Sequence, residues 1–108
     1  MDRNKSLKSE LKIFLQELSK DYPVQKLILF GSRAKGKATV DSDVDLIIVS
    51  SKFKNKKRLD RSPPLYLKWN LKYPVDFLCY TPEEFKRKKK QIGIVQEAIK
   101  EGIEIKAS

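Results

Sequence analysis

The chain of 108 residues contains no histidine and only one cysteine, Cys79. A single cysteine cannot form a disulfide within the chain, and structural zinc sites are built from cysteine and histidine, so both are excluded. No stretch approaches the roughly 20 apolar residues that span a bilayer. The N-terminus, Met1-Asp2-Arg3-Asn4-Lys5, has no apolar signal region behind it. We therefore expect a cytoplasmic protein without a membrane partner.

The length and the charge of the chain limit its organisation and its partners. A chain of 108 residues favours a single domain, residues 1–108, with one modest core. Lysine and arginine number 24 against 14 aspartates and glutamates, a net charge of +10. This excess favours polyanionic partners: nucleotides, nucleic acid or an acidic protein. The alternative is that the lysines only keep a small surface soluble, as in many heat-adapted proteins.

Apolar spacing and capping residues predict the helices in the first two thirds of the chain. Residues 6–20 form an amphipathic helix whose inward stripe is Leu7, Leu11, Phe14, Leu15 and Leu18. The polar stretch 50–61 is interpreted as a flexible loop that could contain a helical turn. A second helix should run from Ser62, its N-cap, to about Asn70, with prolines in its first turn.

The C-terminal third predicts two more helices. Thr81-Pro82-Glu83-Glu84 is a capping box that begins the first of them. The last should cover about 93–101 and end at Gly102. Its inward residues are expected to be Ile94, Val95, Ala98 and Ile99. Residues 103–105 could add a short edge strand.

Three apolar runs predict the main strands: 24–30, 44–49 and 74–80. Both alternating sets of the second run are apolar beyond its aspartates, as expected for a strand covered on both faces. The resulting fold class is α/β of the α+β type, a small mixed sheet flanked by helices.

Three aspartates at strand starts form the candidate site. Asp43 and Asp45 project from the same face because the strand period is two, and they stand about 7 Å apart. Two such carboxylates repel each other unless they share a cation. Asp76 begins an otherwise apolar strand, and the alternative for it is a salt-bridged core residue. Asp41 has the same parity but falls in a loop, where a turn or capping role is favoured.

Strand directions could bring these carboxylates to the loop at Gly31-Ser32. The loop ends the first strand, and Asp43 and Asp45 begin the second, so an antiparallel pair places them at one edge. Asp76 joins them if the third strand runs parallel to the second, with the helix near 62–70 as the crossover. Ser32, like Ser42, could alternatively serve only to cap a turn.

The loop does not fit the P-loop pattern. Gly31-x4-Gly36-Lys37 follows a strand, but the next residue is Ala38, which has no hydroxyl for magnesium. The pattern also leads into another strand instead of a helix.

The aspartates do not fit an EF-hand either. Asp41-x-Asp43-x-Asp45 matches the first calcium ligands of such a loop. The required glycine is replaced by Leu46 and the closing glutamate by Lys52, so this interpretation is rejected.

A third pattern covers about residues 24–80. Phe30-Gly31-Ser32, ten residues and then Asp43-Val44-Asp45, followed by a strand aspartate at Asp76, resembles the nucleotidyltransferases of the DNA polymerase beta superfamily. More narrowly, the chain is similar to the small stand-alone (minimal) nucleotidyltransferases that are often encoded beside a HEPN-domain partner. Lys35 stands where such loops often carry arginine, which keeps the charge but loses the bidentate fork.

The resemblance implies a magnesium-dependent transfer of a nucleoside monophosphate, most simply AMP from ATP, to a hydroxyl. Asp43 and Asp45 would hold the metals, and Asp76 would ligate the second metal of a two-metal site and help to activate the acceptor. Gly31 and Ser32 would bind the phosphates. Arg33 and Lys35 would be further phosphate neighbours.

The resemblance also implies a protein partner of the HEPN type that supplies the acceptor, and a homo-oligomer is possible. The alternative from another class is a non-catalytic, antitoxin-like subunit or a basic nucleic-acid binder, using the patches Lys52–Arg61 and Lys86–Lys90. Against this, the run 86–90 is most simply a solvated helix face. Tyr66 and Trp69 are expected in the core or at an interface.

Overall fold

The computed structural model describes residues 3–36 and 42–106, with side chains from residue 6 onward. Asp41 lies outside the described residues. In chain order the elements are α1 (Arg3–Leu18), β1 (Val24–Phe30), η1 (Gly31–Arg33), β2 (Val44–Ser50), η2 (Ser51–Phe53), α2 (Arg58–Arg61), α3 (Pro63–Lys68), β3 (Val75–Tyr80), α4 (Pro82–Lys88), α5 (Ile94–Glu101) and β4 (Ile103–Glu104). This mixed arrangement confirms the predicted fold class.

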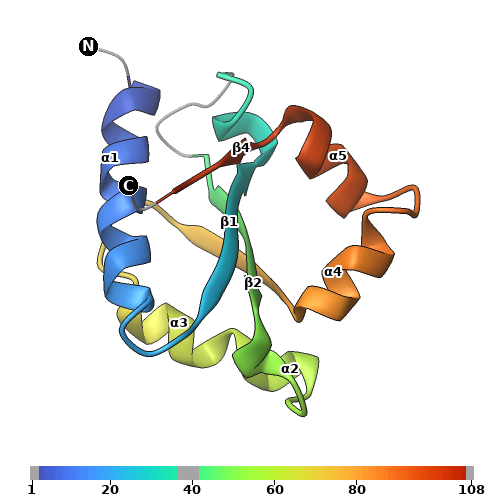
Figure 1. The fold of residues 1–108 in the computed structure, drawn as a ribbon. Helices are drawn as coiled ribbons and strands as arrows, with labels where there is room; N and C mark the ends of the chain where they lie inside the picture. Colours follow the sequence, from blue (N-terminus) through green and yellow to red (C-terminus); the bar gives the residue numbers. More distant parts are fainter. Residues whose placement is uncertain (1–2, 37–41, 107–108) are drawn as a thin grey trace.

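The four strands form one sheet in the order β3-β2-β1-β4 (Figure 1). β1 runs antiparallel to β2 and to β4, whereas β2 and β3 are parallel. The parallel pair requires a crossover; α3 provides it, as the sequence predicted, together with α2, which was not predicted as part of it. Both strand directions on which the candidate site depends are therefore confirmed.

Helices cover both faces of the sheet, so the described residues form two apolar cores in place of the single core that was expected (Figure 1). The larger core packs α1 and Leu65 of α3 against one face, and the smaller packs Phe85 of α4 with Val95 and Ala98 of α5 against the other. β2 contributes Leu46 and Ile48 to the first core and others to the second, which confirms that it is covered on both faces. None of the described helices is long and apolar enough to cross a membrane.

The predicted stripe of the first helix is confirmed, because all five of its residues are buried in the larger core. Two predictions after β2 need correction. The helical turn foreseen within residues 50–61 is present as α2, but the stretch also contains η2 and is anchored by the buried side chains of Phe53 and Arg61. Ser62 is not an N-cap: its φ and ψ of −82° and −31° are helical and its side chain makes no cap bond, because α2 leads directly into it.

The C-terminal helices follow the predictions in part. The capping box of Thr81 and Glu84 is present in both directions. Ile94 and Ile99 are 52% and 46% exposed, so their predicted inward orientation is wrong; only the narrow stripe of α5 formed by Val95 and Ala98 is buried.

α5 ends at Gly102, as predicted, and the glycine is needed there because of close packing. Its φ is −82°, which any residue can adopt. A Cβ atom at this position would lie 2.8 Å from the carbonyl oxygen of Leu29 and would also strike that of Ala98. The glycine therefore allows the chain to turn closely against β1, where β4 begins.

Candidate active site

The sheet register places the proposed carboxylates beside the Gly31 loop. Asp45 of β2 is paired with Phe30, the last residue of β1, on one side and with Asp76 of β3 on the other. Asp45 is partly buried, whereas Asp43 and Asp76 are exposed. The exposure of Asp76 rules out the alternative of a salt-bridged core residue. Three segments that are distant in the sequence therefore meet at one edge of the sheet.

The pKa of Asp45 shows that the three carboxylates interact electrostatically. Burial raises the pKa of its carboxyl group, and the negative charges of Asp76 and Asp43 raise the pKa further. Such a cluster favours binding of a cation, because the cation relieves the repulsion.

The donor set fits a hard cation, since carboxylate oxygens are the ligands that Mg²⁺ prefers. Within 3–36 and 42–106, however, no three acidic, histidine or cysteine side chains are already gathered as a metal centre. Asp45 and Asp76 are paired across neighbouring strands and bring two carboxylates to this position. Bound phosphate oxygens would have to complete the coordination.

Gly31 is fitted against Asp45. Its φ of +77° lies in the left-handed region that favours glycine. A Cβ atom added to it would stand 2.5 Å from Oδ2 of Asp45. Ser32 follows within the short helix η1 and is partly buried. The backbone of the loop at Gly31 therefore packs directly against the carboxylate of Asp45.

Arg33, predicted as a phosphate neighbour, is turned inward. Its side chain is only 4% exposed. Nε and Nη2 donate to the carbonyl oxygen of Ser42 at 3.2 and 2.8 Å, and the guanidinium carbon lies 4.7 Å from the centre of the Tyr73 ring. In this structure the guanidinium is therefore engaged by the protein and does not offer the exposed position that the prediction required.

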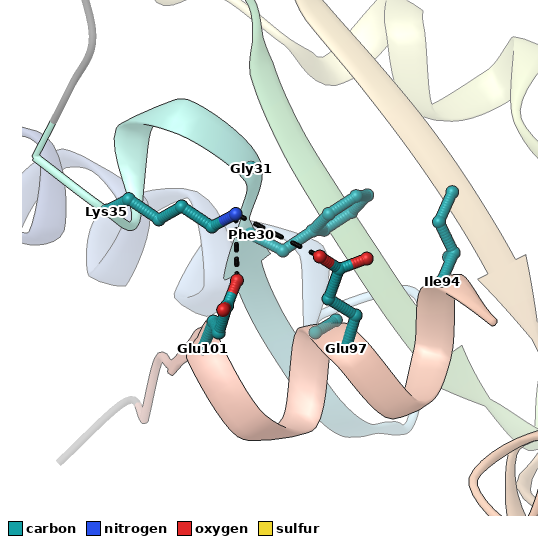
Figure 2. A pocket seen from close by; sticks show the side chains of 7 residues that line it. Phe30, Gly31, Lys35, Ile94, Glu97 and Glu101 are labelled. Carbon is teal, nitrogen blue, oxygen red and sulfur yellow. Dashed lines mark ion pairs between the residues drawn. The ribbon is translucent and has the colours of Figure 1, made fainter. Parts of the chain in front are cut away.

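Lys35 is exposed and reaches across to α5 (Figure 2). Its Nζ lies 2.8 Å from Oε2 of Glu101 and 4.0 Å from Oε1 of Glu97. The hydrogen bond to Glu101 raises the pKa of Lys35. A cavity of about 230 Å³ lies between these residues and the loop, with Phe30 and Gly31 in its wall.

Tyr66 of α3 was not predicted at the site. Its hydroxyl donates a long hydrogen bond, 3.4 Å, to Oδ1 of Asp76. The ring packs edge-on against Phe77 at a centroid distance of 5.0 Å, and the residue is 43% exposed. The sequence carries no signal for this contact, because it depends on how the crossover returns to β3.

Three of the six basic side chains in the stretch 52–61 make contacts within the protein. Lys52 donates to the carbonyl oxygen of Asp21 at 2.7 Å, and Arg58 lies over the Tyr80 ring. Arg61 is 6% exposed and forms an ion pair of 2.6 Å with Glu84, which lowers the pKa of Glu84 to about 2. These contacts weaken the interpretation of this stretch as a nucleic-acid patch.

Comparison with known proteins agrees with this geometry. The family described as "Nucleotidyltransferase domain" matches residues 11–101. The probable protein adenylyltransferase MntA of Haemophilus influenzae is 36% identical over 87 residues, which cover 79% of this chain and 74% of that protein.

Two solved structures share the fold. A candidate nucleotidyltransferase from Sulfolobus solfataricus superposes with a TM-score of 0.67 at 20% identity, covering 94% of this chain and 80% of the other. A toxin–antitoxin structure with AMP-PNP gives a TM-score of 0.55 at 20% identity, covering 90% and 73%. With a family match over most of its length and the loop and carboxylates at one sheet edge, the chain belongs to the nucleotidyltransferase domain family and is a nucleotidyltransferase.

Proposed function

We propose that this enzyme transfers AMP from ATP to a hydroxyl group of a protein, with Mg²⁺ held by Asp43, Asp45 and Asp76. The observation that carries the proposal is the position of Asp45, which lies between the Gly31 loop and Asp76. A cluster of carboxylates that repel one another is the arrangement that a metal–triphosphate complex would neutralise. Adenine specificity is proposed from the relative in Haemophilus influenzae, whose name is protein adenylyltransferase.

The reaction forms one bond to the α-phosphorus and breaks another bond to the same atom. The acceptor oxygen attacks the α-phosphorus of ATP, and the bond from that phosphorus to the bridging oxygen of pyrophosphate breaks. The bound ions would supply charge neutralisation of the attacking and leaving oxygens. Asp76, whose side chain is exposed, is the residue that we assign to accept the proton of the acceptor hydroxyl.

The loop residues have separate roles in this proposal. Gly31 lets the backbone approach the phosphates, because no side chain stands between them. Ser32 donates a hydrogen bond to the β- or γ-phosphate. Lys35, whose side chain is exposed and follows shortly after the loop helix η1, is the cation that we assign to the triphosphate in place of the buried Arg33.

The acceptor is proposed to belong to a second protein, with a HEPN-type partner as the specific hypothesis. A chain of this size offers little surface for an acceptor of its own. Ile92, Ile94 and Ile99 are exposed apolar side chains at and near α5, and Ile94 also lines the cavity beside the loop. Such side chains are suited to contact a partner protein or a second copy of this chain. The cytoplasmic location stays a prediction.

The experiment compares two labels of ATP. The protein is incubated with Mg²⁺ and the product of the neighbouring gene, using ATP labelled at the α- or the γ-phosphate. Transfer of the α label alone, lost in Asp45→Asn, supports adenylyl transfer. Transfer of the γ label would show a kinase instead. No transfer to any acceptor or with any divalent metal, together with RNA binding that falls steeply with salt, would favour the non-catalytic module.

A further inference from the structure

We propose that Arg33 is a positioning residue that holds the proposed metal ligands in register with the phosphate loop, and that it does not itself bind phosphate. This inference rests on the proposed function for the identity of the ligands. It concerns the contact of Arg33 with Ser42, both of which the structure describes.

The first contact joins the loop to the start of β2. Arg33 directly follows Ser32, and the carbonyl group that it binds belongs to Ser42, which directly precedes Asp43. Both Nε and Nη2 point at the same oxygen, at 3.2 and 2.8 Å, which fixes the direction of that carbonyl as well as its distance. One side chain thus ties the loop to the entry of the strand that carries Asp43 and Asp45.

The second contact joins the same guanidinium to the entry of β3. Its carbon lies 4.7 Å from the centre of the Tyr73 ring. Tyr73 precedes Pro74, whose carbonyl oxygen accepts a hydrogen bond of 2.8 Å from the amide of Val44. The carbonyl of Tyr73 is held in turn by the indole nitrogen of Trp69 at 2.8 Å. Asp76 follows three residues after Tyr73 on this fixed segment.

One buried cation, Arg33, therefore links the segments that carry all three parts of the proposed site. Burying a guanidinium is costly, and the residue is only 4% exposed. Among the described residues its polar contact is a carbonyl group, not a carboxylate, so the contact serves to place backbone. To bind phosphate, the guanidinium of Arg33 would first have to break its contacts with Ser42 and Tyr73.

The test uses Arg33→Lys, which keeps the charge and loses the fork, and Tyr73→Leu, which removes the ring. Arg87→Lys, on the exposed part of α4, is the matched control. Two quantities are measured: amide hydrogen exchange at Asp43, Val44 and Asp45 without metal, and the Mg²⁺ concentration that half-saturates ATP binding in calorimetry.

We expect Arg33→Lys to speed exchange at these amides and to raise the half-saturating Mg²⁺ concentration about 10-fold, as removal of groups that orient metal ligands does. At saturating Mg²⁺ its affinity for ATP should stay within about 3-fold of wild type. Tyr73→Leu should act in the same direction and Arg87→Lys should change neither quantity. Tyr73→Leu also serves as the test should Arg33→Lys not fold.

Two results would overturn the inference: exchange and Mg²⁺ dependence equal to wild type in both variants, or a loss of ATP affinity in Arg33→Lys that saturating Mg²⁺ does not restore. The second result would mean direct phosphate binding. Failure of the proposed function looks different, since wild-type protein would then show no Mg²⁺-dependent ATP binding. The exchange measurement would still decide whether Arg33 fixes the start of β2.

Discussion

Replacing Asp45 by asparagine should stabilise the metal-free protein and abolish its response to Mg²⁺ and ATP. Asp45 and Asp76 are direct neighbours across parallel strands, so their carboxylates stand roughly 5–6 Å apart. Two like charges at that distance repel by about 0.7–3 kcal/mol for effective dielectric constants between 80 and 20. Because Asp45 is only partly buried, solvent screening reduces our expectation to about 1 kcal/mol.

A gain of this size raises the melting temperature of a domain of 60–100 residues by about 4–8 °C. Because this chain has 108 residues, we expect a rise near the lower end of that range. Asp60→Asn is the matched control, since Asp60 is an exposed carboxylate on α2. The chain has a net charge of +10, so removing a negative charge away from the site should leave stability unchanged or slightly lower. A stabilising effect confined to position 45 would therefore identify local repulsion.

The assay is thermal unfolding in EDTA and again with Mg²⁺ and ATP. A ligand at 100 times its dissociation constant stabilises the native state by about 2.7 kcal/mol, so wild type and Asp60→Asn should melt at a higher temperature with Mg²⁺ and ATP. Asp45→Asn should show no such rise. The reasoning is refuted if Asp45→Asn is less stable than the control in EDTA, or if Mg²⁺ and ATP stabilise it as much as wild type.

Three further changes follow from the same contacts. Gly31→Ala should lower the unfolding free energy, measured in urea, by about 2–4 kcal/mol and abolish ATP binding, because the left-handed φ and the carboxylate of Asp45 leave no room for a Cβ atom. The control Gly93→Ala, where a Cβ atom meets open space, should change the unfolding free energy by no more than about 1 kcal/mol. Equal losses in the two variants would contradict this prediction. Glu84→Gln should cost about 2 kcal/mol at neutral pH. Because the folded pKa of Glu84 is about 2 against an ordinary 4.5, the contribution is complete above 4.5 and is lost as pH falls toward 2; a pH-independent difference in urea titrations would oppose it. Glu101→Gln should release Lys35 and tighten ATP binding about 3-fold at low salt, and weaker binding would argue against competition for that lysine.

The parts of this protein that could be predicted are those set by local pattern. The apolar stripe of α1 and the three long strands follow from periodicity, and the capping box fixes the start of α4. The meeting of Asp45 with Asp76 could also be predicted, because the two strand directions leave one edge where both strands begin. The roles of these residues as ligands stay a proposal.

The parts that could not be predicted depend on residues brought together from far apart in the chain. Arg33 follows a glycine-serine loop and its sequence context suggests an exposed cation, yet Ser42 and Tyr73 enclose it. Arg61 lies in a run of basic residues, but its partner Glu84 comes 23 positions later. In each case the charge pattern indicates solvent, and only the packed sheet shows which cation is buried.

Calorimetry of ATP binding, with and without Mg²⁺, tests the central claim most directly because it needs no acceptor. The account predicts that ATP binds wild-type protein in a Mg²⁺-dependent manner and that Asp43→Asn/Asp45→Asn removes this binding while the protein stays folded. ATP binding of equal strength in EDTA, or unchanged Mg²⁺-dependent binding in the double variant, would contradict a metal–nucleotide site at this edge of the sheet.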